Sequence, residues 1–269
     1  MYSWHLTEVA IDLEKLKRIA STVDAIRGWD FSRVRTRRDP TPWDYSEVVK
    51  RYLRPSDHVL DIATAGGEIF LALAPHFGSG LGVDISEKMI ETARENVSPH
   101  LKDIVSFEVM AAQDLNVECD AYDTVLNRHG PVFVQPIVNA LRPGGYFLCQ
   151  QVGELNTQNL IQMFGWESGG AYWRHYCDEH ELAHQDPETL AQSFSQMGCR
   201  VVASGSYNVP YTFLDLESFI FHLKAVPLPE EFDMDRHADR LVRFIEENTT
   251  VDGIETNEHR DLLIVQKLR

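Results

Sequence analysis

The chain of 269 residues carries 41 acidic against 25 basic side chains, a formal net charge of −16. Nucleic-acid binders need clustered Lys and Arg to replace the counterions of phosphates, so nucleic acid is disfavoured as a partner. No apolar run approaches the roughly 18 residues of a membrane span, the N-terminus lacks the order of a secretion signal, and four scattered cysteines favour a reducing cytoplasm.

The predicted elements begin with an amphipathic helix over residues 7–28, where apolar side chains recur at helical spacing. A basic stretch follows, with Arg33, Arg35, Arg37 and Arg38. These arginines either hold one anionic ligand or form a solvated linker. A second helix is expected at 43–53. We assign residues 1–40 to an N-terminal helical extension, a candidate lid or homodimer element, and residues 41–269 to the main domain.

From residue 58 onward, short apolar strands alternate with helices. Strands are expected at 58–62, 81–84, 105–109, 122–126, 146–152, 199–206 and 261–265. Helices are expected at 69–73, 86–96, 131–141 and 186–197. Alternation of this kind builds an α/β fold, with a parallel sheet, right-handed crossovers and helices on both faces.

Two insertions interrupt this alternation, at about 154–185 and 214–258, and the second is helical and acidic. Because long loops are rare in a compact domain unless they are functional, we expect both to form a substrate cap. The first insertion is rich in aromatic side chains: Trp166, Tyr172, Trp173 and Tyr176. These side chains either line an aromatic or hydrophobic acceptor pocket or anchor the insertion to the sheet.

The first insertion also contains His180-Glu181-Leu182-Ala183-His184, with His175, Cys177 and Asp178 just upstream. On a helix this spacing places two imidazoles on one face, as in zinc proteases. The surrounding elements belong to a different fold, so we predict a polar lid helix and no metal site.

A turn of small residues follows the first strand, and it reads Asp61-Ile62-Ala63-Thr64-Ala65-Gly66-Gly67. Small side chains let a ligand approach the backbone closely in the crevice at the carboxyl ends of an open α/β sheet. Asp84 ends the second strand, where it can accept hydrogen bonds from a ribose diol. The pattern fits a dinucleotide or S-adenosylmethionine (SAM), but it lacks the Gly-x-Gly-x-x-Gly of dehydrogenases.

The segment Asp61–Gly67 resembles the SAM-binding turn of class I SAM-dependent methyltransferases, whose usual form is Asp-x-Gly-x-Gly-x-Gly. Asp84-Ile85-Ser86 with Met89 resembles the second motif of that family. Leu141-Arg142-Pro143-Gly144-Gly145 resembles the turn before its fifth strand. The resemblance covers residues 58–152. It implies SAM as cofactor and a Rossmann-like, seven-stranded, mostly parallel sheet whose last strand is antiparallel, with helical insertions.

The resemblance also assigns roles to the residues at this edge. The backbone of Ala63, Thr64, Ala65, Gly66 and Gly67 would face the methionine moiety, and Asp61 would help to hold its ammonium group. Asp84 would bind the ribose hydroxyls, with Ile85 and Met89 near the adenine. Ala111, Ala112 and Gln113 would hold the adenine edge, and Asn127 would lie beside the sulfonium centre.

Two positions depart from the family pattern. Ala63 and Ala65 replace glycines, which is tolerable if both keep a negative φ. Ala111 stands where many relatives carry an acid, so Gln113 or Asp114 would substitute for it.

The loop after the fourth strand reads Asn127-Arg128-His129-Gly130 and is expected to face the acceptor. His129 is the candidate general base, because an unperturbed imidazole titrates near neutrality. Arg128 could hold a carboxylate or phosphate of the acceptor. Alternatively, the pair caps the next helix or braces the sheet. Gln150 and Gln151 end the fifth strand on opposite faces, so at most one points at a ligand.

We therefore predict a SAM-dependent methyltransferase that acts on a small molecule. The acidic composition and the two insertions favour a small acceptor, whose reacting atom the motifs leave open between oxygen, nitrogen and carbon. The alternatives are an RNA or protein methyltransferase, and a SAM-binding protein that no longer transfers methyl groups.

Overall fold

The computed structural model describes residues 13–23, 31–167, 169–179, 186–226 and 228–269. A mixed sheet forms its centre, with strands in the order β1-β7-β9-β6-β5-β2-β3-β4 and β8 paired with β9. The strands are β1 (Thr36–Arg38), β2 (His58–Ile62), β3 (Ser79–Asp84), β4 (Val105–Val109), β5 (Tyr122–Arg128), β6 (Leu141–Val152), β7 (Cys199–Phe213), β8 (Thr249–Thr250) and β9 (Gly253–Lys267).

The helices alternate with these strands as the sequence predicts. They are α1 (Leu13–Thr22), α2 (Tyr45–Lys50), α3 (Glu68–Leu73), α4 (Glu87–Asn96), α5 (Val134–Ala140), α6 (Gln158–Met163), α7 (Gly169–Glu179), α8 (Pro187–Gln196), α9 (Leu216–Ala225) and α10 (Met234–Asn248). Ser86, the predicted cap of α4, accepts a hydrogen bond from the Met89 backbone N–H at 3.3 Å, which satisfies a donor that the helix leaves free.

The sheet has the predicted Rossmann-like character. Strands β2 to β6 are parallel to one another, and β9 is antiparallel to both β6 and β7. The antiparallel terminal strand is therefore confirmed. The described residues form nine strands instead of seven, because β1 and β8 add short antiparallel pairs to β7 and β9.

Helices cover both faces of the parallel strands, as predicted. On one face, α2, α3 and α4 bury side chains such as Val49, Phe70 and Ile90 against the sheet. On the other face, α5 and α8 bury Ile137 and Phe194. Because the strands are apolar on both faces, they cannot be stable without both layers of helices.

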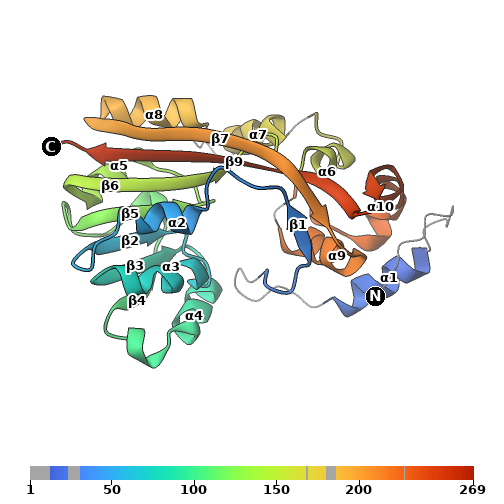
Figure 1. Cartoon of the computed structure of the whole chain (residues 1–269), viewed down its shortest axis with the longest axis horizontal. Helices are drawn as coiled ribbons and strands as arrows, with labels where there is room; N and C mark the ends of the chain where they lie inside the picture. Colours follow the sequence, from blue (N-terminus) through green and yellow to red (C-terminus); the bar gives the residue numbers. More distant parts are fainter. Residues whose placement is uncertain (1–12, 24–30, 168, 180–185, 227) are drawn as a thin grey trace.

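The last two long strands differ most from the prediction, because β7 and β9 are 15 residues each. They pair from Cys199 opposite Lys267 to Phe213 opposite Ile254, with one register shift between Val201 and Ala203. The resulting β7/β9 ribbon runs past the parallel strands and carries α9, α10 and α1 at its far end (Figure 1). The predicted strands covered only residues 199–206 of β7 and 261–265 of β9.

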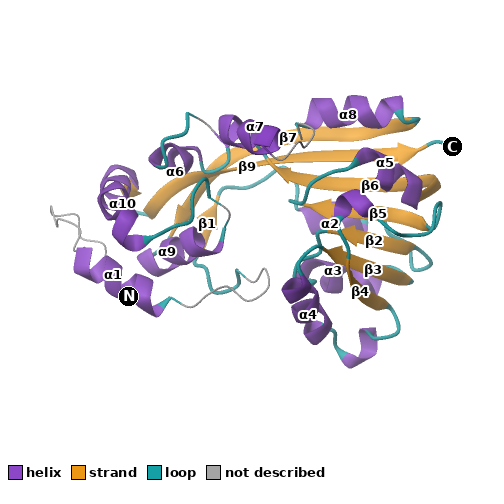
Figure 2. Ribbon diagram, turned by 180° about the vertical axis from the view of Figure 1, so that it is seen from behind, coloured by secondary structure: helices purple, strands orange, loops and turns teal. Residues whose placement is uncertain are grey.

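The far end of the ribbon is the base of a second lobe, which consists of α1, α6, α9, α10 and the ribbon residues beneath them. Its own hydrophobic core includes Leu16, Leu160, Phe213, Phe219 and Leu241. The described part of the N-terminal helix thus shares one core with both predicted insertions. The second lobe lies on the side of the sheet toward which the carboxyl ends of the parallel strands point (Figure 2).

The arginine-rich stretch is neither a solvated linker nor an open anion site. Part of it is β1, which pairs with the edge of β7. Three arginines form ion pairs, Arg35 with Asp215, Arg37 with Asp252 and Arg38 with Glu258. The guanidinium of Arg33 lies 4.8 Å from the centre of the Phe221 ring. These contacts attach the segment before the sheet to the second lobe.

The turn between β8 and β9 depends on a glycine. Gly253 has a φ of 140°, and a Cβ there would overlap the carbonyl oxygen of Phe213. We expect Gly253→Ala to lower the free energy of unfolding by about 2 kcal/mol, measured by denaturant unfolding. Gly144→Ala is the control: φ is 83° and no atom lies within 4 Å of its Cβ, so about 1 kcal/mol is expected. Equal losses of unfolding free energy in the two variants would show that the overlap with the Phe213 carbonyl oxygen does not destabilise Gly253→Ala.

Candidate functional site

The carboxyl ends of β2, β3 and β5 meet at one edge of the sheet, and two loops come together there. The first is the turn between β2 and α3, and the second follows β5. Gly130 in the second loop lies so close to the first that a Cβ on it would overlap the Ala63 methyl group. The glycine is therefore required by the approach of the two loops.

The Asp84 carboxylate holds the first loop against the end of β3. One of its oxygens accepts a hydrogen bond from the Ala65 backbone N–H at 3.0 Å, and the other accepts one from the Ser86 N–H at 2.9 Å. The Thr64 N–H also donates to the Val83 carbonyl at 3.0 Å. A carboxylate oxygen can accept more than one hydrogen bond, so Asp84 still has acceptor capacity for a hydroxyl-bearing ligand.

The turn itself adopts a conformation that the sequence analysis did not expect. Ala63 and Ala65 have φ angles of 58° and 50°, in the left-handed region. The condition under which alanine would be tolerable, a negative φ, is therefore not met. In the left-handed conformation each alanine is less stable than glycine, which has no Cβ, by about 1 kcal/mol. Strain of this kind persists where the surroundings enforce it, and it concentrates at functional sites.

Asp61 lies buried at the end of β2, beneath this turn. Burial raises the pKa of its carboxyl group to about 7, against the opposing effects of the nearby Thr64 hydroxyl and of the positive charge of Arg128. A carboxyl group held near its ionisation midpoint can become fully charged when a cationic group of a ligand arrives. Asp61 is therefore suited to an ammonium group.

The segments assigned to the adenine flank Asp84 on its outer side. The apolar side chain of Ile85 is 71% exposed, and Met89 is partly buried on α4. The Met110 N–H donates to the Asp84 carbonyl at 2.9 Å, which places the start of the 111–113 segment beside it. Ala111 and Ala112 are partly buried, whereas Gln113 and Asp114 are exposed. A large exposed apolar side chain next to an acid fits the base and sugar of a nucleoside.

Asn127 is fully buried and holds the second loop in shape. Its Oδ1 accepts hydrogen bonds from the Gly130 N–H and the Gln151 Nε2, both at 3.1 Å, and its Nδ2 donates to the Pro131 carbonyl at 3.1 Å. Gln151 also donates to the Gly130 carbonyl at 2.8 Å. These bonds engage the whole Asn127 amide, so its place beside a sulfonium remains a prediction.

Arg128 and His129 follow Asn127 at the tip of this loop. His129 has a φ of 67°, and its backbone N–H donates to the Gln150 carbonyl at 2.8 Å. Burial, together with the charges of Arg128 and Arg260, lowers the pKa of the His129 imidazole well below its usual value. The ring is therefore neutral at pH 7. Arg128 is half-buried and makes no hydrogen bond or ion pair with any described residue.

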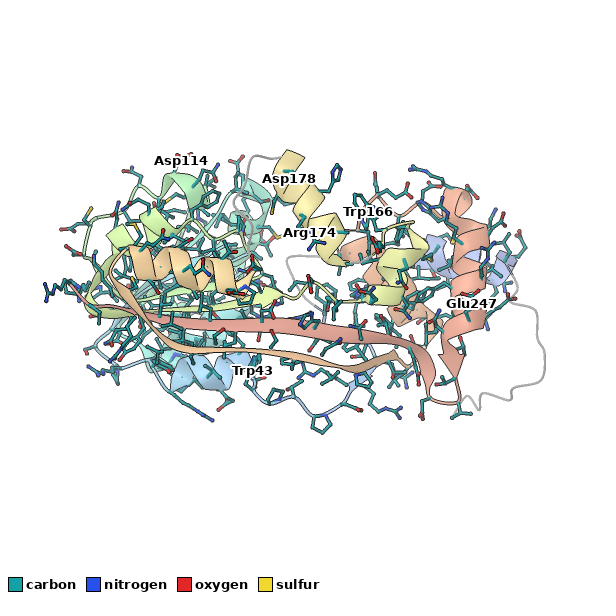
Figure 3. The ribbon with its side chains drawn as sticks, turned by 90° about the horizontal axis from the view of Figure 1, so that it is seen from above. Trp43, Asp114, Trp166, Arg174, Asp178 and Glu247 are labelled. Atoms are coloured by element: carbon teal, nitrogen blue, oxygen red, sulfur yellow. The ribbon has the colours of Figure 1, made fainter. Side chains whose placement is uncertain are left out.

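Two further residues line this edge, and the sequence analysis missed them. The Trp43 indole donates from Nε1 to the Gln150 Oε1 at 3.0 Å, and its ring packs edge-on against Tyr207. The Tyr45 hydroxyl is buried and donates to the Leu148 carbonyl at 3.1 Å. Trp43 lies on the opposite side of the β7/β9 ribbon from α7 (Figure 3). Both precede the first parallel strand, where the sequence shows only an ordinary helix.

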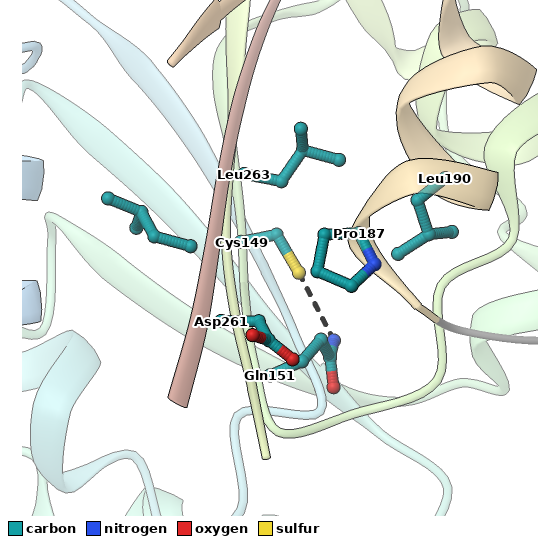
Figure 4. Close-up of a pocket in the computed structure, with 7 residues that line it drawn as sticks. Cys149, Gln151, Pro187, Leu190, Asp261 and Leu263 are labelled. Atoms are coloured by element: carbon teal, nitrogen blue, oxygen red, sulfur yellow. Dashed lines mark hydrogen bonds between the residues drawn. The ribbon is translucent and has the colours of Figure 1, made fainter. Parts of the chain in front are cut away.

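Two hollows in the surface are lined by none of the residues predicted to hold the cofactor. One, under α8, is lined by Cys149, Gln151 and Pro187 (Figure 4). It is too small for a ligand, and burial raises the pKa of the Cys149 thiol to about 12. The other lies at the amino ends of β2, β3 and β4, beside His58 and Tyr122. Neither belongs to the predicted site.

The His180–His184 segment falls outside the described residues. Of the residues upstream, His175 packs against Trp166, with the centres of the two rings 5.1 Å apart, and Cys177 is a buried free thiol. Among the residues that the structure describes, no three His, Cys, Asp or Glu side chains are grouped so that they could hold a metal ion. In the same part of the chain, no helix is long and apolar enough to cross a membrane.

The residues at the carboxyl edge fit a nucleoside with a charged amino-acid tail. Besides Asp61, Asp84 and Ile85, the turn contains the Thr64 hydroxyl, which is buried close to the Asp61 carboxyl group.

A family model described as a methyltransferase domain matches residues 53–198. The demethylmenaquinone methyltransferase of Symbiobacterium thermophilum is 30% identical over 154 residues, which are 52% of this chain. The matched region spans 59% of that relative's length. The family match therefore covers the parallel strands and both loops of the site.

Solved structures share the fold at low sequence identity. The YcgJ protein of Bacillus subtilis has a TM-score of 0.57 at 17% identity, over 84% of this chain and 98% of its own. Geranyl diphosphate methyltransferase, solved in complex with SAM, has a TM-score of 0.51 at 14% identity, over 82% of this chain and 84% of its own.

The two strained alanines lead to an unusual stability prediction. Ala63→Gly and Ala65→Gly should each leave the free energy of unfolding unchanged or raise it by up to about 1 kcal/mol, because relief of the left-handed strain offsets the greater freedom of the unfolded chain. Ala72→Gly, at an exposed position of α3, should instead cost about 1 kcal/mol. Losses at positions 63 and 65 equal to that of the control would contradict the strain.

Asp61 should make stability depend on pH. Its folded pKa of about 7 is above its ordinary value of 3.8, so the folded state binds more protons between these values, and the carboxyl group lowers stability as pH rises through this range. Asp61→Asn removes that cost. We expect its stability advantage over the wild type to grow by up to about 3 kcal/mol between pH 5 and pH 8. Thermal melts in which the stability difference between Asp61→Asn and the wild type does not change with pH would contradict the raised pKa.

Proposed function

We propose that this chain, which belongs to the class I SAM-dependent methyltransferases, transfers the methyl group of SAM to a small-molecule acceptor. The observation that carries the proposal is the position of Arg128 at the carboxyl end of β5, where its side chain makes no hydrogen bond or ion pair with any described residue. That end of the parallel strands points toward the second lobe (Figure 2). The acceptor would lie between that edge and the second lobe.

The residues of the first loop would hold the cofactor. Asp84 would accept hydrogen bonds from the ribose hydroxyls, and Asp61 would pair with the ammonium group. The backbone of residues 63–67 would face the methionine moiety, with Ile85, Met89 and residues 111–113 around the adenine. When bound, SAM supplies a methyl group on a positively charged sulfur, so alignment of the acceptor accounts for most of the rate.

The second lobe would act as the substrate cap. Its elements come from both predicted insertions and from the N-terminal extension, and they share one hydrophobic core. Such a cap would exclude water and enclose a small acceptor, with Arg128 and His129 facing it from the sheet side.

Charge argues against a nucleic-acid acceptor. The chain has a formal charge of −16, and three arginines of its basic stretch are already paired with Asp215, Asp252 and Glu258. Phosphate contacts require free cationic side chains. A protein or RNA acceptor is therefore the weaker alternative.

The relative named demethylmenaquinone methyltransferase favours one acceptor class in particular. A quinol ring carries ionisable hydroxyl groups and an aromatic face, and Arg128 could pair with its ionised oxygen. The match covers only part of the relative, so this acceptor is a second, more specific candidate within the same proposal.

Binding of the cofactor is tested by isothermal titration of the full chain with SAM and with S-adenosylhomocysteine. Asp84→Asn should weaken both affinities by about 10- to 100-fold, because a hydrogen bond to a charged group is worth about 1.5–3 kcal/mol. Asp103→Asn, an exposed control at the opposite, amino end of the parallel strands, should bind as the wild type does. Absence of binding to the wild type would refute the proposal.

The acceptor class is tested by release of S-adenosylhomocysteine. The protein would be incubated with SAM and either 1,4-naphthohydroquinone, a set of small phenols and carboxylic acids, transfer RNA or a denatured protein mixture. Turnover with a small molecule supports the proposal. Turnover with RNA or protein alone would contradict it.

A further inference from the structure

The His129 imidazole has an amide as its neighbour. The Gln150 Nε2 lies 3.5 Å from the His129 Nε2, at the long end of hydrogen-bond distances. His129 Nδ1 makes no hydrogen bond with any described residue. The direction in which the Gln150 amide points therefore decides which ring nitrogen carries the proton.

Trp43 fixes that direction. An indole N–H can only donate a hydrogen bond, so the atom of Gln150 that lies 3.0 Å from the Trp43 Nε1 must be the oxygen. The amide NH2 group then points at His129. Because this group is only a donor, the His129 Nε2 facing it must carry a lone pair. A neutral imidazole has its proton on the other nitrogen, Nδ1.

Burial and the surrounding charges disfavour the charged form of the ring. Burial has the largest effect on the pKa of His129, and Arg128 and Arg260 lower it further. The carboxylate of Glu258 is already engaged by Arg38, Tyr207 and Arg260. Asp61 and Tyr45, the other titratable groups near Arg128, form no hydrogen bond or ion pair with His129. Within the described residues, no carboxylate contacts the imidazole.

We propose that Trp43 and Gln150 are positioning residues that hold His129 in its neutral, Nδ1-protonated form, so that His129 donates a hydrogen bond to the acceptor instead of removing a proton from it. This inference rests on the proposed function and deepens it. A donor N–H beside the unpaired Arg128 favours an acceptor that presents an oxygen anion, such as a phenolate, enolate or carboxylate.

The chemistry balances without a protein base. The bond between the methyl carbon and sulfur breaks, and its electron pair stays on sulfur as a thioether. The new bond to the methyl carbon uses an electron pair of the acceptor. The charge of the acceptor rises by one unit, so an acceptor that arrives as an oxygen anion leaves neutral, and no proton has to be transferred in that step.

The test is nitrogen-15 NMR of the histidine rings in the full chain at pH 7, where the two neutral tautomers and the imidazolium give different signals. The His129 signal, assigned by its loss in His129→Asn, should report a proton on Nδ1. Trp43→Phe, which frees the amide to turn over, should give a mixture of tautomers. Gln150→Glu places a carboxylate at Nε2 and should produce the imidazolium near neutral pH. Trp166→Phe, in the first insertion, should change nothing at His129.

A proton on Nε2 or an imidazolium in the wild type at pH 7 would overturn the proposal. A Trp43→Phe protein whose His129 keeps the wild-type tautomer would also overturn it. If Trp43→Phe does not fold, Gln150→Glu gives an independent answer. These signals need no acceptor. Cofactor binding, measured by titration on the same samples, shows separately whether the proposed function fails.

Discussion

The hydrogen bond from the Ala65 N–H to the Asp84 carboxylate is the contact on which the rest of the site depends. It ties the turn after β2 to the end of β3, and it holds that turn in a left-handed conformation that its two alanines would not adopt by themselves. The second loop then needs Gly130 to approach this turn. Two adjacent strands and two loops are thus fixed by one side chain.

The β7/β9 ribbon determines where the second lobe lies. A pair of strands that extends beyond the sheet would expose its apolar residues, and the second lobe covers them with α1, α6, α9 and α10. Glu258 in β9 accepts hydrogen bonds from Arg38 and Tyr207 and pairs with Arg260. Breaking a buried charge cluster of this kind is costly, so the segment before the sheet remains attached to the ribbon.

The two loops differ in charge, and in the proposed function this difference would separate the two substrates. The first loop has Asp61 and Asp84, which suit the ammonium group and the ribose of a cofactor. The second has Arg128 and His129, which suit an oxygen anion. Because charges interact strongly in a partly buried site, the proposed arrangement would align a cationic methyl donor with an anionic acceptor.

The sequence by itself determined the parallel part of the fold and the first loop. Strands at 58–62 and 105–109, the Ser86 cap and the place of Asp84 at the turn all agree with the structure, because they depend on local apolar runs, caps and the spacing of one motif. Tertiary structure decided the remainder. The length of the ribbon comes from pairing between distant strands, and the left-handed turn at Ala63 and Ala65 is held by the hydrogen bond to Asp84 on the next strand. The lowered pKa of His129 comes from burial and from the charges of Arg128 and Arg260, which only folding brings together.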